Sequence, residues 1–355
     1  MKRTPNKVPV WGAALIAALL FPALGWGKGR SDQNTLYIYN WTYYTPDSVI
    51  EKFEAEYGVT VIYDEFPSNE DMYAKIKAGG SDYDIVFPSQ DFVSIMINQG
   101  MFEKIDKSKL SNLKNVDPAV LQRANYDPNM DYAVPYYFGA AGIAVNTARV
   151  PAFERSWSIF ERNDLRGRMV MLDDMREVMG DALKFLGYSV NTKNPSQINA
   201  ARDLINNRWK PNLVKFDAEA FGKGYADGEF WVVQGYPEVV YEEIADNEQL
   251  RRDTVFFIPP EGGPSYIDSM CILKGSKHID LAHKFIDFIH RPEIYAEFCD
   301  YFGFPATANI PARQFKKGAS HYNAEDLTRT ELKYDLGEAL DLYNTAWVDT
   351  IRLGD

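Results

Sequence analysis

The feature that most constrains the fold is an alternation of apolar runs and amphipathic segments that begins at residue 36. "LYIYN" (36–40) and "VTVIYDEF" (59–66) are rich in β-branched and aromatic residues, which predicts two buried strands. The segment 48–57 between them places its apolar residues on one helical face, and Gly58 follows it, which predicts a helix that ends there. A strand, a helix and a second strand in this order are typical of an α/β fold.

The same alternation continues through residue 89. Ser68 is a suitable N-cap for a short helix that ends at Gly79 and Gly80, and "YDIVFPS" (83–89) follows as a third strand. Because helices separate the three strands, we expect the strands to lie parallel in an open sheet. Such sheets bind ligands outside the carboxyl ends of their strands, so the residues that follow each strand are the first candidates for a site.

The chain has 355 residues, which is too long for one ordinary hydrophobic core, so we expect two lobes. A second α/β set begins with the strand "RMVML" (168–172) and continues through "FWVVQGY" (230–236), which follows a glycine-rich segment, 222–228, that we expect to be a turn. The extended segment "YYFGAAGIAVN" (136–146) suits a connector that passes between the lobes. The predicted fold class is therefore α/β, with a mainly parallel sheet flanked by helices in each of two lobes joined by crossover strands.

The last quarter of the chain adds one strand and two helices. "SYIDSMCIL" (265–273) predicts the strand, and residues 280–290 predict a helix with Leu281 and Phe285 facing inward. A second helix is expected near the C-terminus, where an apolar stripe at helical spacing indicates core packing. The stripe consists of Leu336, Leu340, Tyr343, Trp347 and Ile351.

The first 27 residues differ from the rest of the chain. Lys2, Arg3 and Lys7 precede the uncharged apolar run 9–27, after which polar residues resume, as is typical of a secretory signal. We therefore expect an exported protein, with residues 1–27 as its signal or export segment. No cysteine near the end of the run could carry a lipid, and an uncleaved membrane anchor is the alternative to cleavage.

The net charge of the chain is −12, and its acidic residues are spread along the whole length. This distribution argues against a nucleic-acid partner and favours cationic ones. The histidines show no metal-ligand spacing, and neither a nucleophile elbow nor a phosphate-binding loop is present. Cys271 and Cys299 could form one disulfide or remain two buried thiols. We therefore expect a binding protein without cofactor or metal, and not an enzyme.

Aromatic and polar side chains collect where the first and third strands end. Trp41, Tyr43 and Tyr44 follow the first strand, and Ser89 and Asp91 follow the third. The carboxyl ends of parallel strands share one edge of a sheet, so these residues stand where a ligand would bind. Core or lid packing is the more common reason for such a cluster, and that alternative stays open on the sequence alone.

Three acids in the second half of the chain are candidates for chemistry. Asp174 and Glu177 lie between a strand and a helix, where they could form a reciprocal cap or bind a ligand. Asp268 lies inside an apolar strand next to Tyr266, where it needs a cation or several hydrogen bonds, because an unpaired buried charge is costly. Asp174 and Asp268 could also serve as the acids of a glycoside hydrolase, although no spacing in the sequence determines their separation.

Aromatic faces and carboxylates together restrict the ligand. Aromatic rings attract cations and cover methylene groups, whereas carboxylates pair with ammonium groups. A ligand that is apolar in the middle and cationic at its ends satisfies both. The composition of the expected site therefore points to a linear polyamine.

A series of motifs, in a constant order along the chain, resembles the motifs of one family. They run from about Asn34 to the C-terminus and include "LYIYNWTYY", "NEDMYAKIKAG", "YDIVFPS", "YAVPYYFGAAGIAVN", "DDMREV" and "HRPEIYAEF". The family is that of the spermidine/putrescine-binding proteins of polyamine ABC importers. The resemblance implies a two-lobed periplasmic binding protein that traps its ligand between the lobes on closure.

The resemblance also implies how the chain divides and what it works with. Residues 34–141 with 267–310 correspond to the first lobe, and residues 142–266 with 311–355 correspond to the second. The implied location is the periplasm, with a tether through an uncleaved N-terminal segment as the alternative. The implied partners are putrescine or spermidine and the membrane permease of an ABC importer, and we expect a monomer that binds no nucleic acid.

Carried over position by position, the resemblance assigns roles within the site. Trp41 and Tyr44 enclose the methylene groups of the ligand. Asp174 and Glu177 hold one amine end, and Asp268 holds another. The expected ligand-binding residues are Trp41, Thr42, Tyr44, Ser89, Asp91, Asp174, Glu177, Gln234, Tyr266, Asp268, Phe304 and Lys333.

Some of these positions differ from the family's pattern. Tyr43 stands where relatives often have an acid, Lys333 stands where they have glutamine, and Asp91 replaces an aromatic residue. The segment 231–236 lacks the family's Trp-Asn-Gly, so we expect Trp231 or Gln234 to complete that side of the site. Compared with relatives, the site then has one acid fewer, at Tyr43, and one ammonium more, at Lys333. Because spermidine carries a third ammonium group, these changes predict that putrescine binds more tightly than spermidine.

Two other functions stay open at this point. Adjacent tyrosines, such as Tyr43 with Tyr44 or Tyr136 with Tyr137, could bind ferric iron as phenolates in a protein of the same fold. A secreted hydrolase that uses the acids of the cleft is the other alternative.

Overall fold

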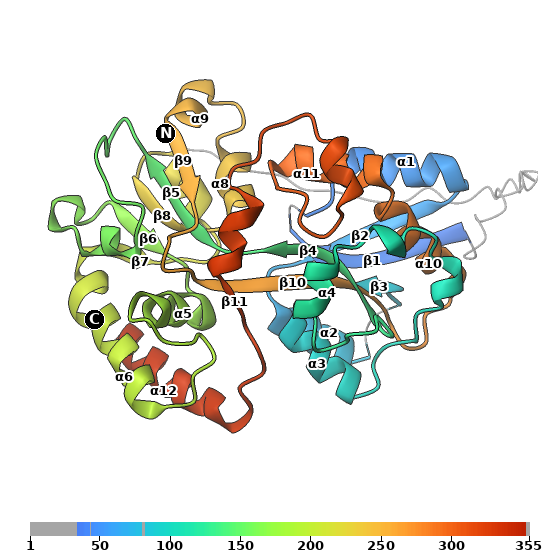
Figure 1. Ribbon diagram of the computed structural model, residues 1–355, viewed down its shortest axis with the longest axis horizontal. Coiled ribbons are helices and arrows are strands. Elements are labelled where there is room, and N and C mark those ends of the chain that lie inside the picture. Colours follow the sequence, from blue (N-terminus) through green and yellow to red (C-terminus); the bar gives the residue numbers. More distant parts are fainter. Residues whose placement is uncertain (1–33, 43, 80–81, 353–355) are drawn as a thin grey trace, which may run out of the picture. The chain divides into compact units, whose positions relative to one another are not determined.

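A computed structural model describes residues 34–42, 44–79 and 82–352 of the chain, which form two sheets flanked by helices (Figure 1). The expected export segment, residues 1–27, and Tyr43 lie outside the described residues. Among the described residues, every helix is too short or too polar to span a bilayer.

The first sheet contains the three strands expected at the start of the chain. β1 runs parallel to both β2 and β3, as predicted, and β10 then pairs antiparallel with β3 and β4, so the sheet is mixed. Its strands are β1 (Thr35–Trp41), β2 (Thr60–Phe66), β3 (Ile85–Val86), β4 (Ala133–Gly139), β10 (Pro264–Ile272) and β11 (Glu331–Leu332).

The helices around the first sheet begin and end where the sequence indicates. α1 ends at Gly58, which adopts the left-handed conformation with φ 64°, and Ser68 caps α2 by accepting the backbone N–H of Asp71. The helices are α1 (Asp47–Tyr57), α2 (Asn69–Lys77), α3 (Gln90–Asn98), α4 (Pro118–Arg123), α10 (Ile279–Ile289) and α11 (Pro292–Phe302).

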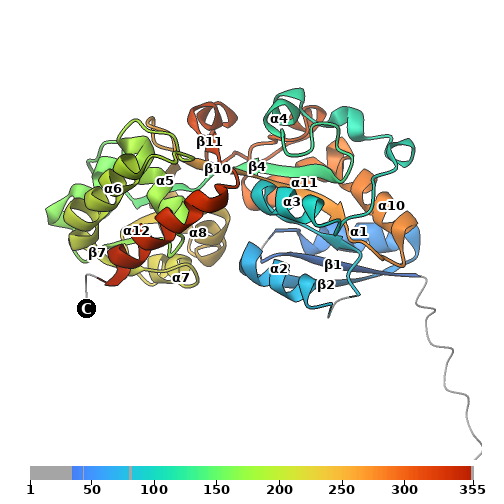
Figure 2. The ribbon, with the colours of Figure 1, turned by 90° about the horizontal axis from the view of Figure 1, so that it is seen from below.

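The second sheet is also mixed, with the strand order β7-β6-β8-β5-β9. β6 is parallel to β7 and β8, whereas β5 is antiparallel to β8 and β9. The strands are β5 (Gly142–Asn146), β6 (Met169–Met171), β7 (Leu213–Phe216), β8 (Val232–Gly235) and β9 (Thr254–Phe257). The helices around it, seen from below in Figure 2, are α5 (Met175–Phe185), α6 (Pro195–Leu204), α7 (Phe221–Ala226), α8 (Pro237–Glu243), α9 (Glu248–Asp253) and α12 (Leu340–Arg352).

The glycine-rich segment 222–228 was expected to be a turn, and this prediction is wrong, because most of it forms α7. Its glycines allow close packing of the helix and do not break it. A Cβ on Gly224 would lie 2.2 Å from the ring of Phe230, and a Cβ on Gly222 would lie 2.9 Å from Val239. Gly228, with φ 77°, follows the helix and turns the chain toward β8.

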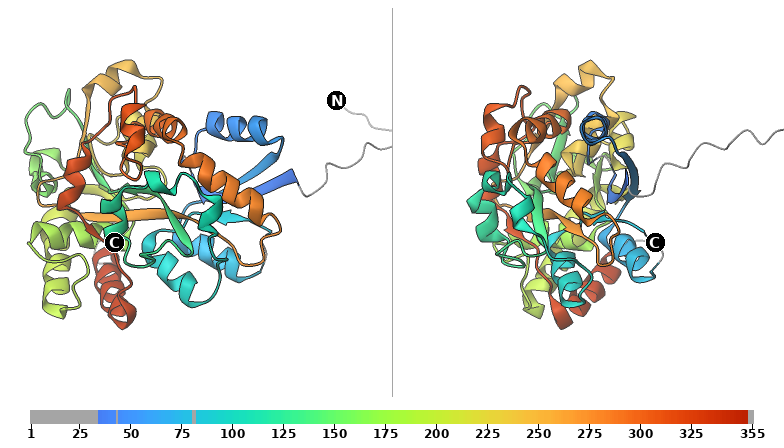
Figure 3. Two further views of the ribbon diagram at one scale, coloured as in Figure 1. Left: turned by 45° about the vertical axis from the view of Figure 1, so that its right-hand side comes forward. Right: turned by 90° about the vertical axis from the view of Figure 1, so that its right-hand side faces the viewer.

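Two extended connections join the sheets, as the segment 136–146 predicts. β4 belongs to the first sheet and β5 to the second, with only Ala140 and Ala141 between them. The chain returns from β9 to β10, which lies beside β4 (Figure 3). The change of sheet at residues 140–141 is compatible with the expected lobe boundary, and the full set of boundaries remains our proposal.

The expected inward faces of the late helices are mostly correct. Leu281 and Phe285 are buried in the core against the first sheet, and Leu336 and Tyr343 are buried in the core of the second. Leu340 is exposed, contrary to expectation, because α12 begins there and its first turn projects beyond the packed face. Both cysteines are buried free thiols.

Candidate functional site

The expected site residues follow strands whose carboxyl ends share an edge. β1 and β3 are parallel, and Tyr44 and Ser89 come shortly after them. In the second sheet, β6 and β8 are parallel, and Asp174 and Tyr236 come after those strands. The antiparallel strand β10 carries Asp268 past Ser89, with which it forms an isolated β-bridge. Strand topology therefore brings acids from distant parts of the chain together.

Among the expected site acids, Asp268 is the one whose two carboxyl oxygens both accept side-chain hydrogen bonds. The hydroxyl of Ser89 donates to Oδ1 at 2.6 Å, and the hydroxyl of Tyr44 donates to Oδ2 at 2.7 Å. The side chain is buried, and burial raises the pKa of Asp268 to about 7, although the two hydroxyl donors act in the opposite direction. The carboxylate is thus held in a fixed orientation and gains a proton close to neutral pH.

Glu238 is a second buried acid near Asp268 that the sequence did not single out. It lies in the first turn of α8, and its Oε2 atom has no hydrogen-bond partner. Burial, together with the charge of Asp268, raises the pKa of Glu238 to about 8. An acid in the first turn of a helix ordinarily faces solvent and interacts with the helix dipole, so the sequence gives no reason to expect Glu238 to be buried. The one feature that could have indicated a site residue is that Glu238 follows the strand β8.

Asp174 caps α5, as the capping interpretation predicted. Its Oδ1 atom accepts the backbone N–H groups of Arg176 at 2.8 Å and Glu177 at 3.0 Å. Glu177 does not complete a reciprocal capping box, because its Oε1 atom accepts the ammonium of Lys333 at 2.5 Å. The cap and the expected contact with a ligand are compatible, since Asp174 remains partly exposed.

Lys333 is buried and points toward the acids of α5. Burial lowers the pKa of Lys333, but the carboxylates of Glu177, Asp174 and Asp91 outweigh this effect and raise it above its usual value. The backbone of Lys333 is held on both sides, since its N–H donates to Ser265 O and its carbonyl accepts the side-chain amide of Gln90.

Asp91 and Gln234 are two further residues of the expected site. Asp91 is partly exposed and accepts the N–H of Phe92 in the first turn of α3. Gln234 is fully buried, with its Oε1 atom on the N–H of Leu172 and its Nε2 atom without a partner. Asp181, one turn beyond Glu177 on α5, is also fully buried, and neither of its carboxyl oxygens has a partner.

Aromatic rings cover the side of the site formed by β4 and β10. Tyr266 lies edge-on to Tyr236 with ring centroids 5.9 Å apart. Phe304, which is fully buried, stacks on Tyr137 at 4.3 Å. These rings give the acids an apolar surrounding, which is why burial dominates their pKa values.

Trp41 is the last residue of β1, and Thr42 follows it. The indole N–H of Trp41 donates to Phe87 O at 2.8 Å, its ring packs on Phe66, and the ring is only partly buried. Thr42 is exposed. Trp231, an expected candidate for the opposite wall, lies with the guanidinium of Arg168 at 5.0 Å from its ring and packs on the core of the second sheet.

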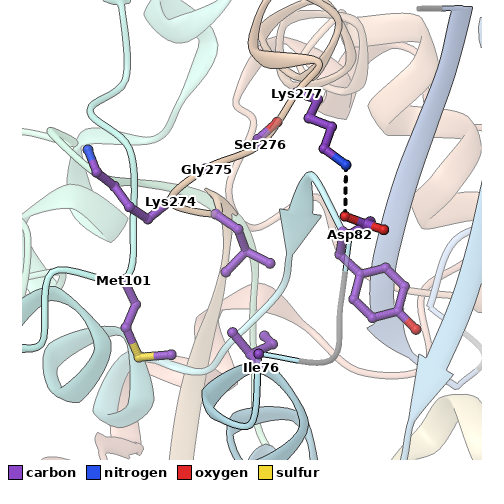
Figure 4. A pocket seen from close by; sticks show the side chains of 10 residues that line it. Ile76, Asp82, Met101, Lys274, Gly275, Ser276 and Lys277 are labelled. Atoms are coloured by element: carbon purple, nitrogen blue, oxygen red, sulfur yellow. Dashed lines mark hydrogen bonds and ion pairs between the residues drawn. The ribbon is translucent and has the colours of Figure 1, made fainter. Parts of the chain in front are cut away.

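A separate pocket lies at the first sheet, away from these acids (Figure 4). Its lining includes Ile76 and Met101, and Lys277 pairs with Asp82 at 3.0 Å. None of the expected site residues lines it. The acid of this pocket, Asp82, is paired with Lys277. The pocket therefore lacks the excess of buried carboxylates that is found around Asp268 and Glu177.

Two mixed sheets joined by crossover strands, with buried acids and aromatic rings from both, define the class of a two-lobed ligand-binding protein. The chain matches the family model described as "Bacterial extracellular solute-binding protein" over residues 48–322, and it belongs to this family.

The chain is also similar to individual proteins whose names state a ligand. The chain is 36% identical to the spermidine/putrescine-binding periplasmic protein of Escherichia coli over 342 residues, which is 94% of this chain and 96% of that protein. It is 32% identical to the putrescine-binding periplasmic protein SpuD of Pseudomonas aeruginosa, covering 83% of this chain and 84% of that one. Among solved structures, the TpPotD lipoprotein of Treponema pallidum is 51% identical with a TM-score of 0.86, over 89% of this chain and 99% of that chain.

Proposed function

We propose that this protein is the extracytoplasmic receptor of a polyamine ABC importer and that it binds putrescine more tightly than spermidine. Four acids that are each less than one-tenth exposed carry this proposal: Glu177, Asp181, Glu238 and Asp268. Buried carboxylates are costly unless a cation compensates them. The ammonium of Lys333 is close enough to lower the pKa of Asp181 and Asp268, and a bound polyamine would supply further ammonium groups.

The names of the relatives support the class of ligand. The related proteins of Escherichia coli and Pseudomonas aeruginosa are named for binding spermidine or putrescine. By analogy, Asp268 with its hydroxyl donors receives one ammonium of the ligand, and Asp174 with Glu177 receives another. The rings of Tyr44 and Tyr266 then cover the methylene groups between the two ends.

The preference for putrescine follows from the number of available carboxylates. Spermidine carries three ammonium groups, and each needs its own strong acceptor when it is buried. Glu177 pairs with Lys333 in the ligand-free protein, so a ligand ammonium reaches it only when Lys333 is displaced, and the charge of Lys333 stays in the site. Asp91 compensates only in part, because it is partly exposed and also stabilises the charge of Lys333.

Titration calorimetry on protein that has been unfolded and refolded to remove ligand tests both statements. We expect putrescine to bind more tightly than spermidine by about 1–3 kcal/mol, the range for one unmatched charged contact. Equal or tighter binding of spermidine would contradict the preference. Binding of neither would contradict the proposed function, and native mass spectrometry of freshly purified protein would then identify the mass that it does carry.

The ferric-iron alternative has less support. Burial raises the pKa of Tyr44, Tyr136 and Tyr137 well above the usual value, which opposes the phenolate form that iron requires. Their hydroxyls are also engaged, for example that of Tyr44 with Asp268. A colour on addition of ferric iron would favour this alternative.

A further inference from the structure

Lys333 stands next to two carboxylates that are related by one turn of α5. Glu177 and Asp181 are at positions i and i+4, so they share a helix face with a rise of about 6 Å between them. Both side chains are fully buried. The ammonium of Lys333 contacts Oε1 of Glu177, whereas Oε2 of Glu177 and both oxygens of Asp181 have no partner.

The surroundings of Asp181 favour its protonated form while Lys333 remains at Glu177. An ionised carboxylate without a hydrogen bond or cation in a fully buried position costs several kcal/mol. Burial raises the pKa of Asp181 well above the usual value, and the charges of Glu177 and Asp174 raise it further. Lys333 and the side chain of Gln234 act in the opposite direction, and they are the groups that would stabilise an ionised Asp181.

A glycine and an amide side chain lie close to the carboxyl group of Asp181. Gly263 faces the carboxyl group, and a Cβ at this position would lie 3.0 Å from Oδ1. The Nε2 atom of Gln234 has no hydrogen-bond partner, and the Gln234 side chain is close enough to Asp181 to lower the pKa of that acid. Lysine has a flexible stem of four carbons, so its ammonium can move while the backbone of Lys333 stays bonded to Ser265 and Gln90.

We propose that Asp181 is a second carboxylate for the ammonium of Lys333, used when a ligand occupies the first. The inference rests on the proposed function. A ligand ammonium at Glu177 would meet the like charge of Lys333, and the two would compete for one carboxylate. Lys333 relieves the repulsion by moving one helical turn to Asp181. The O–H bond of Asp181 breaks, its proton leaves to solvent, and Lys333 stays an ammonium throughout.

This exchange makes room for the ligand without leaving a charge unpaired. Before binding, Glu177 pairs with Lys333 and Asp181 is neutral. After binding, Glu177 pairs with the ligand and Asp181 pairs with Lys333. One buried proton is replaced by one ligand ammonium, so binding is coupled to proton release.

Calorimetry in buffers of different ionisation enthalpy measures this release. Asp268 and Glu238, with pKa values raised to about 7 and about 8, also lose protons on binding, but both acids are present in every variant, so their release cancels in the comparison. We expect Asp181→Asn to release about one proton fewer per bound putrescine than the unchanged protein, and Lys333→Met to show the same loss. Any proton that putrescine itself gains or loses on binding is the same for all variants, so it cancels when the variants are compared.

Asp203→Asn, at an exposed acid of α6 paired with Arg202, is the matched control and is expected to release as many protons as the unchanged protein. Equal release from Asp181→Asn and this control would overturn the exchange while leaving the proposed function intact. Absence of polyamine binding would overturn both.

Infrared spectroscopy supplies a readout that does not depend on a ligand. Without polyamine, the protein is expected to show the C=O band of a buried protonated carboxylic acid that Asp181→Asn lacks, whereas any bands of Asp268 and Glu238 are common to both and cancel in the difference spectrum. If the band is missing from the unchanged, folded protein, Asp181 holds no proton to release and the proposal is wrong.

Discussion

The two acid groups of the site are buried in different ways. Both oxygens of Asp268 accept hydroxyl hydrogen bonds, from Ser89 and Tyr44, whereas Glu177 and Asp181 together leave three oxygens without a hydrogen-bond partner. Hydroxyl donors make Asp268 a preorganised acceptor without adding a charge. The acids of α5 instead depend on the ammonium of Lys333. If both groups bind ligand ammoniums, as we propose, neutral donors prepare the first group and a resident cation prepares the second, and only the second has to rearrange.

The largest effect is expected from Asp268→Asn. The variant loses the preorganised carboxylate in a buried position, so putrescine binding should weaken by about 3 kcal/mol, which calorimetry will measure. Asp203→Asn serves as the control and should bind as the unchanged protein does. Unimpaired binding by Asp268→Asn would mean that Asp268 is not in contact with the ligand.

The same variant should not destabilise the ligand-free protein. Because the pKa of Asp268 is raised to about 7, its contribution to stability is fully present below its unfolded pKa of about 4 and is lost as the pH rises through about 7. At pH 8 the asparagine variant avoids this loss. Its melting temperature, compared by calorimetric scans with that of the unchanged protein, should therefore be equal or higher.

A smaller effect is expected from Lys333→Gln, which changes the group formed by the acids of α5. Removal of the resident ammonium frees Glu177 for a ligand amine, so the preference should move from putrescine toward spermidine by about 2 kcal/mol. The double variant Lys333→Gln with Tyr43→Glu, which adds the acid that relatives often have, should move it further. Competition between the two polyamines measures the shift, and an unchanged ratio in both variants would exclude Lys333 as a determinant of preference.

The smallest effect is expected from Ser89→Ala. One of the two hydroxyl donors to Asp268 is removed, so binding should weaken by about 1 kcal/mol, the usual contribution of a single hydrogen bond. The hydroxyl lowers the pKa of Asp268, so its removal raises that pKa, and the rise of affinity with pH should shift to higher pH. Affinities measured from about pH 6 to pH 9 will show this; a shift to lower pH would contradict the role given to Ser89.

Much of the fold was predictable because it depends on local patterns. The alternation of strands and helices, the ends of α1 and α2, and the change of sheet between β4 and β5 all follow from residues within a short window. The helix α7 was not predicted, because the glycines within the same short window indicate a turn. The close approach of Gly224 to Phe230, which makes glycine necessary there, involves packing that composition alone does not reveal.

The site was less predictable, because its acids depend on partners far away in the chain. A charged residue inside the apolar strand at Asp268 correctly predicted a need for hydrogen bonds. Its partners are 179 positions away at Ser89 and 224 positions away at Tyr44, although both had been noted as residues that follow a strand. Glu238 and Asp181 were not noted, since an acid on a helix ordinarily points to solvent, and only tertiary packing buries these two.

The side-chain amide of Gln90 has a consequence for the residence time of a ligand. Its Oε1 atom accepts the N–H of Ile267 in β10, and its Nε2 atom donates to the carbonyl of Lys333. In the expected division into lobes, Gln90 and Ile267 belong to the first lobe and Lys333 to the second, so separation of the lobes breaks the hydrogen bond to Lys333, at a transient cost of about 1–3 kcal/mol for each group left unsatisfied. A barrier that is the same in both directions slows entry and escape equally and leaves the equilibrium constant unchanged. On the proposed function, Gln90 would therefore slow the exchange of ligand between the protein and the surrounding solution.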